Sequence, residues 1–145
     1  DARLLIAGRP REPELADLIK QEAALDERVM AHFGFVADEE MHVYLRSADL
    51  FVIPYTEILN SGALMLALSF DCPVLAADKG ALRQFSEEVG EQWVNVYQGN
   101  LSAAVLDKAL NAACDDQRHP VDLAAYEPAR VASLLAAAFR TTAKQ

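Results

Sequence analysis

The stretch Ala48–Ala77, ADLFVIPYTEILNSGALMLALSFDCPVLAA, decides the fold of this chain. An apolar run, Leu50–Ile53, ends at a proline, and a second apolar run, Val74–Ala77, follows another proline. Between them, a polar loop leads into Asn60-Ser61-Gly62 and then into an apolar segment of helical length. The predicted order is strand, loop, helix, strand. In an open α/β sheet, this order places the loop and the helix start at the edge where ligands bind.

The alternation of strands and helices continues on both sides of this stretch. Further strands are predicted at Leu4–Ala7, Val29–Phe33 and Trp93–Val96, and further helices from Glu12, from Asp38, and at Gly80–Val89, Leu101–Cys114 and Glu127–Thr142. No hairpin signal separates the strands, so parallel strands joined by right-handed crossovers are expected. The predicted fold class is α/β, a doubly wound, Rossmann-like parallel sheet flanked by helices.

Two of these elements carry a specific burial prediction. The continuous apolar run Leu4–Ala7 is typical of a parallel strand that is covered on both faces. The last helix has apolar residues at helical spacing and is most simply part of the core, with exposure of part of this apolar face as the alternative; the residues are Val131, Leu134, Leu135, Ala138 and Phe139.

The length and charge of the chain limit its function class. A chain of 145 residues fits one domain, 1–145, with a substantial core. Its net charge of −9 argues against a general nucleic-acid binder, whose surface would be basic. Cys72 and Cys114 form no metal or redox motif, and both are expected to be buried free thiols in a reducing compartment. The sequence contains no apolar run long enough to predict a membrane span.

The predicted helix that begins near Asn60 is a candidate anion site. Asn60 or Ser61 could cap the helix, and Gly62 would let a ligand approach the backbone. The amides of Gly62 and Ala63 would then face a phosphate, in the field of the helix dipole. Ordinary helix capping without any ligand is the alternative interpretation.

These motifs also carry a family resemblance. ADLFVIP, a following Glu, a glycine-containing turn, an apolar helix and PVLA occur in this order after GFVADEEMHVYLRS. From about Leu4 to Val96, the chain resembles the C-terminal, donor-binding domain of retaining GT-B glycosyltransferases of the group 1 type. The resemblance implies a nucleotide-sugar donor, no metal or other cofactor, and a cytoplasmic, often bacterial enzyme.

The resemblance further implies that the chain is part of a two-domain protein. Asp1-Ala2-Arg3 leads straight into a strand without an initiator Met. In the family, an acceptor-binding domain and the first strand and helix of the donor domain would come earlier. The missing element normally carries a basic pair for the donor diphosphate. Any membrane contact is expected only through the parent protein.

The resemblance assigns roles to residues of the candidate site. Glu57 would contact the sugar hydroxyls near the reacting carbon and is the candidate catalytic residue. The other predicted donor-binding residues are Phe35 and Val36 at the base, Asn60, Ser61, Gly62 and Ala63 at the phosphates, and Lys79 as a cation. The alternatives are a core position for Phe35 and solvated surface positions for Glu57 and Lys79.

The sequence departs from the family pattern at the second Glu, which usually binds the ribose. Its position falls on Met65 or Leu66, depending on the direction of counting, and neither can accept a hydrogen bond. A lesser change puts Asp71 where a glycine is common. Two alternative functions therefore stay open: half of a nucleotide-sugar epimerase of similar fold, and a non-catalytic, degenerate interaction domain.

Overall fold

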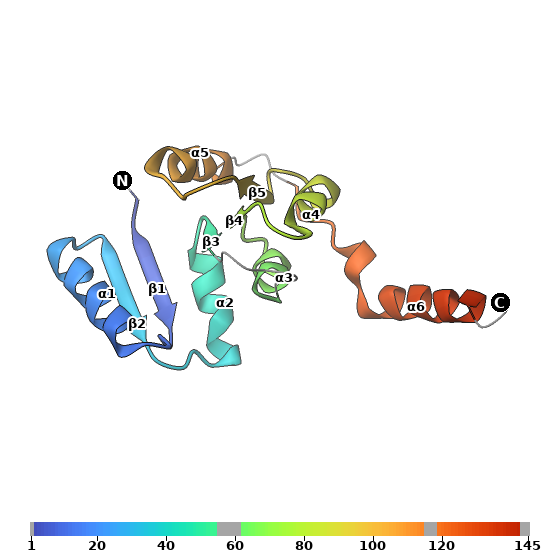
Figure 1. Ribbon diagram of the computed structural model, residues 1–145, viewed down its shortest axis with the longest axis horizontal. Helices are drawn as coiled ribbons and strands as arrows, with labels where there is room; N and C mark the ends of the chain where they lie inside the picture. Colours follow the sequence, from blue (N-terminus) through green and yellow to red (C-terminus); the bar gives the residue numbers. More distant parts are fainter. Residues whose placement is uncertain (1, 55–61, 115–118, 143–145) are drawn as a thin grey trace. The chain divides into compact units, whose positions relative to one another are not determined.

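The computed structural model describes residues 2–54, 62–114 and 119–142 (Figure 1). The chain separates into two compact units, Asp1–Val43 and Tyr44–Gln145, and each is described by itself below. The sequence-based assignment of one domain to residues 1–145 stays a prediction.

The first unit is a β-α-β unit followed by the start of a helix. It contains β1 (Leu4–Gly8), α1 (Pro13–Leu25), β2 (Val29–Phe33) and the first part of α2 (Asp38–Ser47). The two strands run parallel, with Leu4 opposite Val29 and Gly8 opposite Phe33. Pro13 starts α1, where its missing N–H is not needed. In Figure 1, α1 lies beside this strand pair, as the crossover connection requires.

Burial in the first unit differs from the prediction. Leu4 and Leu5 of β1 are 49% and 43% exposed, and no described residue before Tyr44 is buried. The expectation that this strand is covered on both faces is therefore wrong for the described residues. The side chains of a strand point to the two faces of its sheet, and within the first unit no layer of described elements packed on these faces buries a residue of β1.

The second unit contains the remaining elements. They are β3 (Phe51–Ile53), α3 (Gly62–Ser69), β4 (Val74–Ala77), α4 (Leu82–Val89), β5 (Val94–Tyr97), α5 (Ala103–Ala113), the short 3-10 helix η1 (Ala124–Tyr126) and α6 (Pro128–Thr142). The strands form a parallel sheet in the order β3-β4-β5, with Phe51 opposite Val74 and Val74 opposite Val94. The chain thus folds as the predicted Rossmann-like α/β protein, with parallel sheets flanked by helices.

The core of the second unit lies on both faces of β4, and every residue of this strand is buried. Val74 and Ala76 belong to a cluster with residues of α3 and α4. Leu75 and Ala77 point to the opposite face, where they cluster with Ala109 of α5. Because both faces are covered, the strand consists only of apolar residues.

The end of α3 explains the change at Asp71. Asp71 adopts a left-handed backbone conformation, with φ 55°, at the position that follows the helix. Its N–H donates to Leu68 O at 3.0 Å, and the N–H of Cys72 donates to Ala67 O at 3.0 Å. This pair of bonds is the Schellman closure, which favours glycine at the left-handed position. Asp tolerates this conformation better than most residues, and its Oδ1 also accepts a hydrogen bond from the N–H of Val121.

A buried serine joins α4 to β5. The carbonyls of Trp93 and Tyr97 accept bonds from the β4 side, so the carbonyl of Val94 faces the outer edge of the sheet. Ser86 is 2% exposed, and its hydroxyl donates to Val94 O at 2.5 Å. The hydroxyl thus satisfies a buried carbonyl that the sheet leaves without a strand partner.

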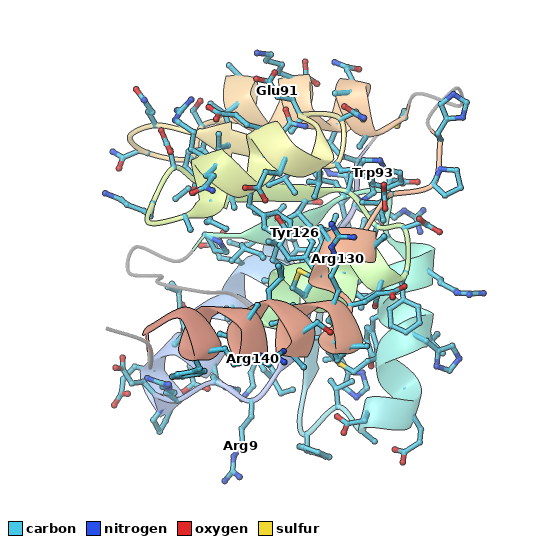
Figure 2. The ribbon with its side chains drawn as sticks, turned by 90° about the vertical axis from the view of Figure 1, so that its right-hand side faces the viewer. Arg9, Glu91, Trp93, Tyr126, Arg130 and Arg140 are labelled. Atoms are coloured by element: carbon cyan, nitrogen blue, oxygen red, sulfur yellow. The ribbon has the colours of Figure 1, made fainter. Side chains whose placement is uncertain are left out.

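The segment before α6 is tied to α4 by an aromatic residue. The ring of Tyr126 lies 4.7 Å from the ring of Phe85, and its hydroxyl donates to the carboxylate of Glu88. Figure 2 labels Tyr126 together with Arg130 and Arg140 of α6.

The predicted packing of α6 in the core is wrong: Val131, Leu134 and Phe139 are 39%, 61% and 73% exposed. An apolar stripe shows that one face of a helix is apolar, but it does not show which other element packs against that face.

The Tyr126–Glu88 contact predicts a pH dependence. Burial and the hydrogen bond to Glu88 raise the pKa of Tyr126 to about 12. A group whose pKa is raised by folding stabilises the fold at pH values below its unfolded pKa of 10.0. This contribution should decline between about pH 10 and 12. Titration of the tyrosinate absorbance should show a component near pH 12 that is missing in Tyr126→Phe. Unchanged titration of the variant would contradict the assignment.

The element boundaries agree with the sequence analysis to within a few residues; α4, for example, begins at Leu82 where the predicted helix began at Gly80. The cysteine prediction is half right: Cys72 is buried, whereas Cys114, just after α5, is exposed.

Within the described ranges, no helix combines the length and apolar character needed to cross a membrane.

Candidate functional site

The candidate site lies where the strands of the second unit end. β3 ends at Ile53, and α3 begins at Gly62. The loop between them carries the predicted residues Glu57, Asn60 and Ser61, which lie outside the described residues. The described part of the site therefore consists of the start of α3 and the residues that follow β4 and β5.

The start of α3 is accessible. Gly62 is exposed, and a Cβ placed on it would meet no atom within 4 Å. The next residue, Ala63, is half-buried and packs against the core. A helix start directs backbone N–H groups and a partial positive charge outward. The open space at Gly62 therefore leaves room for an anion such as a phosphate.

The rest of α3 is fixed by its packing. Leu64, Ala67 and Leu68 are 3%, 0% and 0% exposed, which anchors one face of the helix. Leu66 also packs against this cluster, and Met65 is half-buried. The predicted position of the ribose-binding Glu is therefore occupied by an apolar side chain at the core. Any ribose contact must come from other residues.

A polar cluster joins the ends of β4 and β5. The Nε atom of Arg83 donates to Asp78 Oδ2 at 3.0 Å, and a second guanidinium nitrogen donates to the same oxygen. The side-chain amide of Gln98 donates to this oxygen at 3.1 Å. The backbone reinforces the contact, because the N–H of Asp78 donates to Tyr97 O at 2.7 Å.

The electrostatics of this cluster follow from its hydrogen bonds. Arg83 and then Gln98 hold the pKa of Asp78 below its usual value, and Lys79 adds a smaller attraction. Asp78 in turn raises the pKa of Arg83. Asp78 is therefore ionised at neutral pH and orients the guanidinium of Arg83 at the carboxyl end of the sheet.

Sequence reasoning found only part of this cluster. It singled out Lys79, which is exposed, but missed Arg83 and Gln98. Gln98 comes two residues after the end of the predicted strand Trp93–Val96, and that position was a usable signal. Arg83 lies in the first turn of α4, and only the fold shows that it reaches back to Asp78.

The predicted base-binding residues belong to the first unit. Gly34 follows β2 with φ 151°, a conformation that favours glycine. Phe35 is 84% exposed, so the alternative that it belongs to the core is wrong. Val36 is half-buried. The structure thus leaves the Phe35 ring accessible for stacking, and its use by a ligand stays a prediction.

A metal centre finds no support in the described part of the chain, which contains no group of three or more His, Cys, Asp or Glu side chains that could hold an ion.

Comparison with known proteins decides the family. Residues 1–115 match the family described as glycosyl transferases group 1. The chain belongs to this family. The match confirms the resemblance to GT-B glycosyltransferases and covers both the described start of α3 and the Asp78 cluster of this glycosyl transferase domain.

Two curated relatives are similar along most of the chain. Both are named GDP-mannose:glycolipid 4-beta-D-mannosyltransferase and come from Xanthomonas campestris pv. campestris. They are 34% and 33% identical to the chain over 132 residues, or 90% of its length. The chain spans 38% of the length of either relative.

Proposed function

We propose that this domain is the donor-binding half of a glycosyltransferase that moves a sugar from a nucleoside diphosphate to an acceptor. The start of α3, with Gly62 and Ala63, binds the diphosphate together with Asn60 and Ser61. Glu57 binds the sugar hydroxyls, Phe35 and Val36 contact the base, and Lys79 adds positive charge. The acceptor and any group opposite the reacting carbon come from another part of the protein.

One observation carries this proposal: the start of α3 is open at Gly62 within a domain that belongs to a sugar-transferring family. Helix starts stabilise phosphate oxygens through N–H groups and the helix dipole. The Asp78–Arg83–Gln98 cluster at the same sheet edge adds an oriented guanidinium. Family membership also favours transfer over the epimerase and non-catalytic alternatives.

The chemistry follows from where charge develops. When the sugar leaves the donor, negative charge grows on the diphosphate. Backbone dipoles that already point at this position stabilise the transition state more than the ground state. A carboxylate at Glu57 that accepts hydrogen bonds from sugar hydroxyls fixes the orientation of the reacting carbon.

The names of the relatives suggest the donor and acceptor classes. Both printed names specify GDP-mannose and a glycolipid. We therefore propose GDP-mannose as the first donor to test and a lipid-linked acceptor presented on the cytoplasmic side of a bacterial membrane. The family resemblance implies retention, whereas the β-D linkage in the names of both relatives implies inversion when the donor is α-linked. NMR of the product anomer decides between the two courses: an α-linked product shows retention and a β-linked product shows inversion.

Calorimetric titration with GDP, GDP-mannose and other nucleoside diphosphates and their sugars tests donor binding. We expect Glu57→Ala to weaken binding of the sugar-bearing ligands at least about tenfold, which corresponds to about 1.4 kcal/mol. Binding of the bare diphosphates should not change, because they carry no sugar hydroxyls for Glu57 to contact. Glu39→Ala, at an exposed helix position, is the control. Absence of binding for every nucleotide, with the complete protein and a folded domain, would rule out the proposed function.

A further inference from the structure

The helix α6 has an apolar face whose large side chains are exposed. Val131, Leu134, Leu135 and Phe139 recur at intervals of three and four residues, which places them on one side of the helix. All four are exposed, and so is every other side chain of α6 whose burial the structure describes. A helix of this length usually depends on packing of its apolar face for stability. The exposed face of α6 is therefore suited to bind a partner.

The other side of α6 is basic. It carries Arg130, Ser133 and Arg140, and Figure 2 labels the two arginines. The hydroxyl of Ser133 donates to Ala129 O at 2.9 Å, and Nε of Arg140 donates to Ala136 O at 3.0 Å. None of the ion pairs within the described part of the chain involves either arginine. The positive charge of α6 is therefore available to an anionic partner.

The charge of this region is opposite to that of the chain as a whole. Residues 128–145 contain the basic residues Arg130, Arg140 and Lys144 and none of the 22 acidic residues, although the net charge of the chain is −9. An apolar face together with basic residues is typical of a helix that lies in the surface of an anionic membrane. The apolar side chains then enter the acyl boundary, while the long basic side chains stay at the headgroups.

A comparison with α1 shows why the charge matters. α1 also exposes a large apolar side chain, Leu18, but its polar positions carry Glu14, Asp17 and Glu22 against Lys20. An anionic surface repels a helix of this charge and attracts α6. A second copy of α6 carries the same positive charge as the first, so it lacks the charge complementarity that an anionic bilayer has.

We propose that α6 binds the surface of an anionic lipid bilayer, with its apolar face in the acyl boundary and its arginines at the headgroup phosphates. The sequence analysis expected membrane contact only through the parent protein, whereas this inference assigns a contact to the chain itself. α6 lies past residue 115, where the match to the family ends, so the matched region does not account for its exposed face.

The place of α6 in the chain connects this contact to the candidate site. α6 and the start of α3 belong to the same compact unit, Tyr44–Gln145. Binding of α6 to a bilayer would therefore hold the donor site at the surface on which a lipid-linked acceptor is presented. This connection rests on the proposed function, but the binding of α6 to lipid does not.

Sedimentation of the complete polypeptide with lipid vesicles, without nucleotide, tests the inference. One basic residue near an anionic surface strengthens binding about fivefold. We therefore expect at least about tenfold stronger binding to vesicles of phosphatidylcholine and phosphatidylglycerol than to phosphatidylcholine alone, and a decline of this preference with added salt. The double variant Arg130→Gln, Arg140→Gln should lose the preference. Leu134→Asp should bind anionic vesicles at least about tenfold more weakly, and Leu18→Asp in α1 is the matched control that should bind as the wild type does.

Equal binding of the folded wild type to both kinds of vesicle, or binding to neither, would overturn the inference. Two further results would overturn it by identifying another occupant. If Leu134→Asp lowers the melting temperature of a polypeptide that binds no vesicles, α6 packs against another segment of that polypeptide. If the variant dissociates a dimer that binds no vesicles, α6 packs against a second copy.

Calorimetric titration of the same protein with nucleotide sugars keeps this inference separate from the proposed function. Donor binding without vesicle binding would overturn only the role of α6. Vesicle binding without donor binding would overturn only the proposed function.

Discussion

Gly62→Asp should weaken nucleotide-sugar binding on the order of a hundredfold and leave the domain folded. Gly62 is exposed, lies outside the left-handed region and has room for a side chain. A carboxylate at a helix start stabilises the helix by about 0.3–1 kcal/mol. The same charge about 5 Å from a bound phosphate, at an effective dielectric of about 20, is repelled by on the order of 3 kcal/mol. Calorimetry should therefore show an affinity loss on the order of a hundredfold for GDP-mannose.

Two controls separate charge at this site from other effects. Ala103→Asp adds the same charge to the first residue of α5, another exposed helix start. Gly62→Ala adds a Cβ without charge in the space that the structure leaves open for an anion. We expect Ala103→Asp to bind the donor as the wild type does, and Gly62→Ala to bind it more weakly than the wild type but more tightly than Gly62→Asp. A folded Gly62→Asp variant with unchanged affinity would show that the diphosphate does not lie at the start of α3.

Leu68→Ala should unfold much of the second unit at temperatures that the wild type tolerates. Leu68 is 0% exposed and belongs to the cluster that joins α3 to the sheet. Truncation of a buried leucine costs about 2–5 kcal/mol, a large share of the about 5–15 kcal/mol that stabilises a typical domain. Urea denaturation followed by the fluorescence of Trp93, the single tryptophan, should give a correspondingly lower midpoint.

Trp93 is a suitable reporter because it is 5% exposed and belongs to the same cluster as Leu68 (Figure 2). The matched control is Leu134→Ala in α6, where the leucine is 61% exposed. This variant should change the free energy of unfolding by less than about 0.5 kcal/mol. Similar midpoints for the two variants would contradict the burial that the structure assigns to α3.

Much of the fold was predictable because it rests on local patterns. Apolar runs bounded by glycine and proline predicted each strand, and the lack of hairpin signals predicted parallel pairing. The structure bears this out. The pattern around Pro54 and Pro73 also placed α3 and β4 correctly. These signals lie within about ten residues of one another, so the sequence contains them directly.

Burial was less predictable because it depends on partners far along the chain. The runs LLIA in β1 and VLAA in β4 have the same character, yet only β4 is buried. Likewise, the apolar stripe of α6 is exposed, and Cys114 is accessible although Cys72 is not. A pattern shows that a face is apolar, but it does not supply the surface that covers it.

The candidate site also contains residues that local sequence predicted and residues that only the tertiary structure revealed. Gly62, Ala63 and Lys79 were found because they follow strands or begin a helix. Arg83 was missed because its contact with Asp78 and Gln98 depends on how α4 returns across the ends of β4 and β5. The left-handed conformation of Asp71 was likewise hidden until the Schellman closure of α3 was seen.

The sequence by itself determined the alternation of strands and helices, their parallel arrangement and the family, because periodicity and short motifs are encoded by neighbouring residues. Only the tertiary structure decided that β4 has two strand neighbours and β1 one, and that a guanidinium lies at the carboxyl end of the sheet. Such contacts join residues distant in sequence, and their free energy depends on packing and hydrogen-bond geometry that no local pattern specifies.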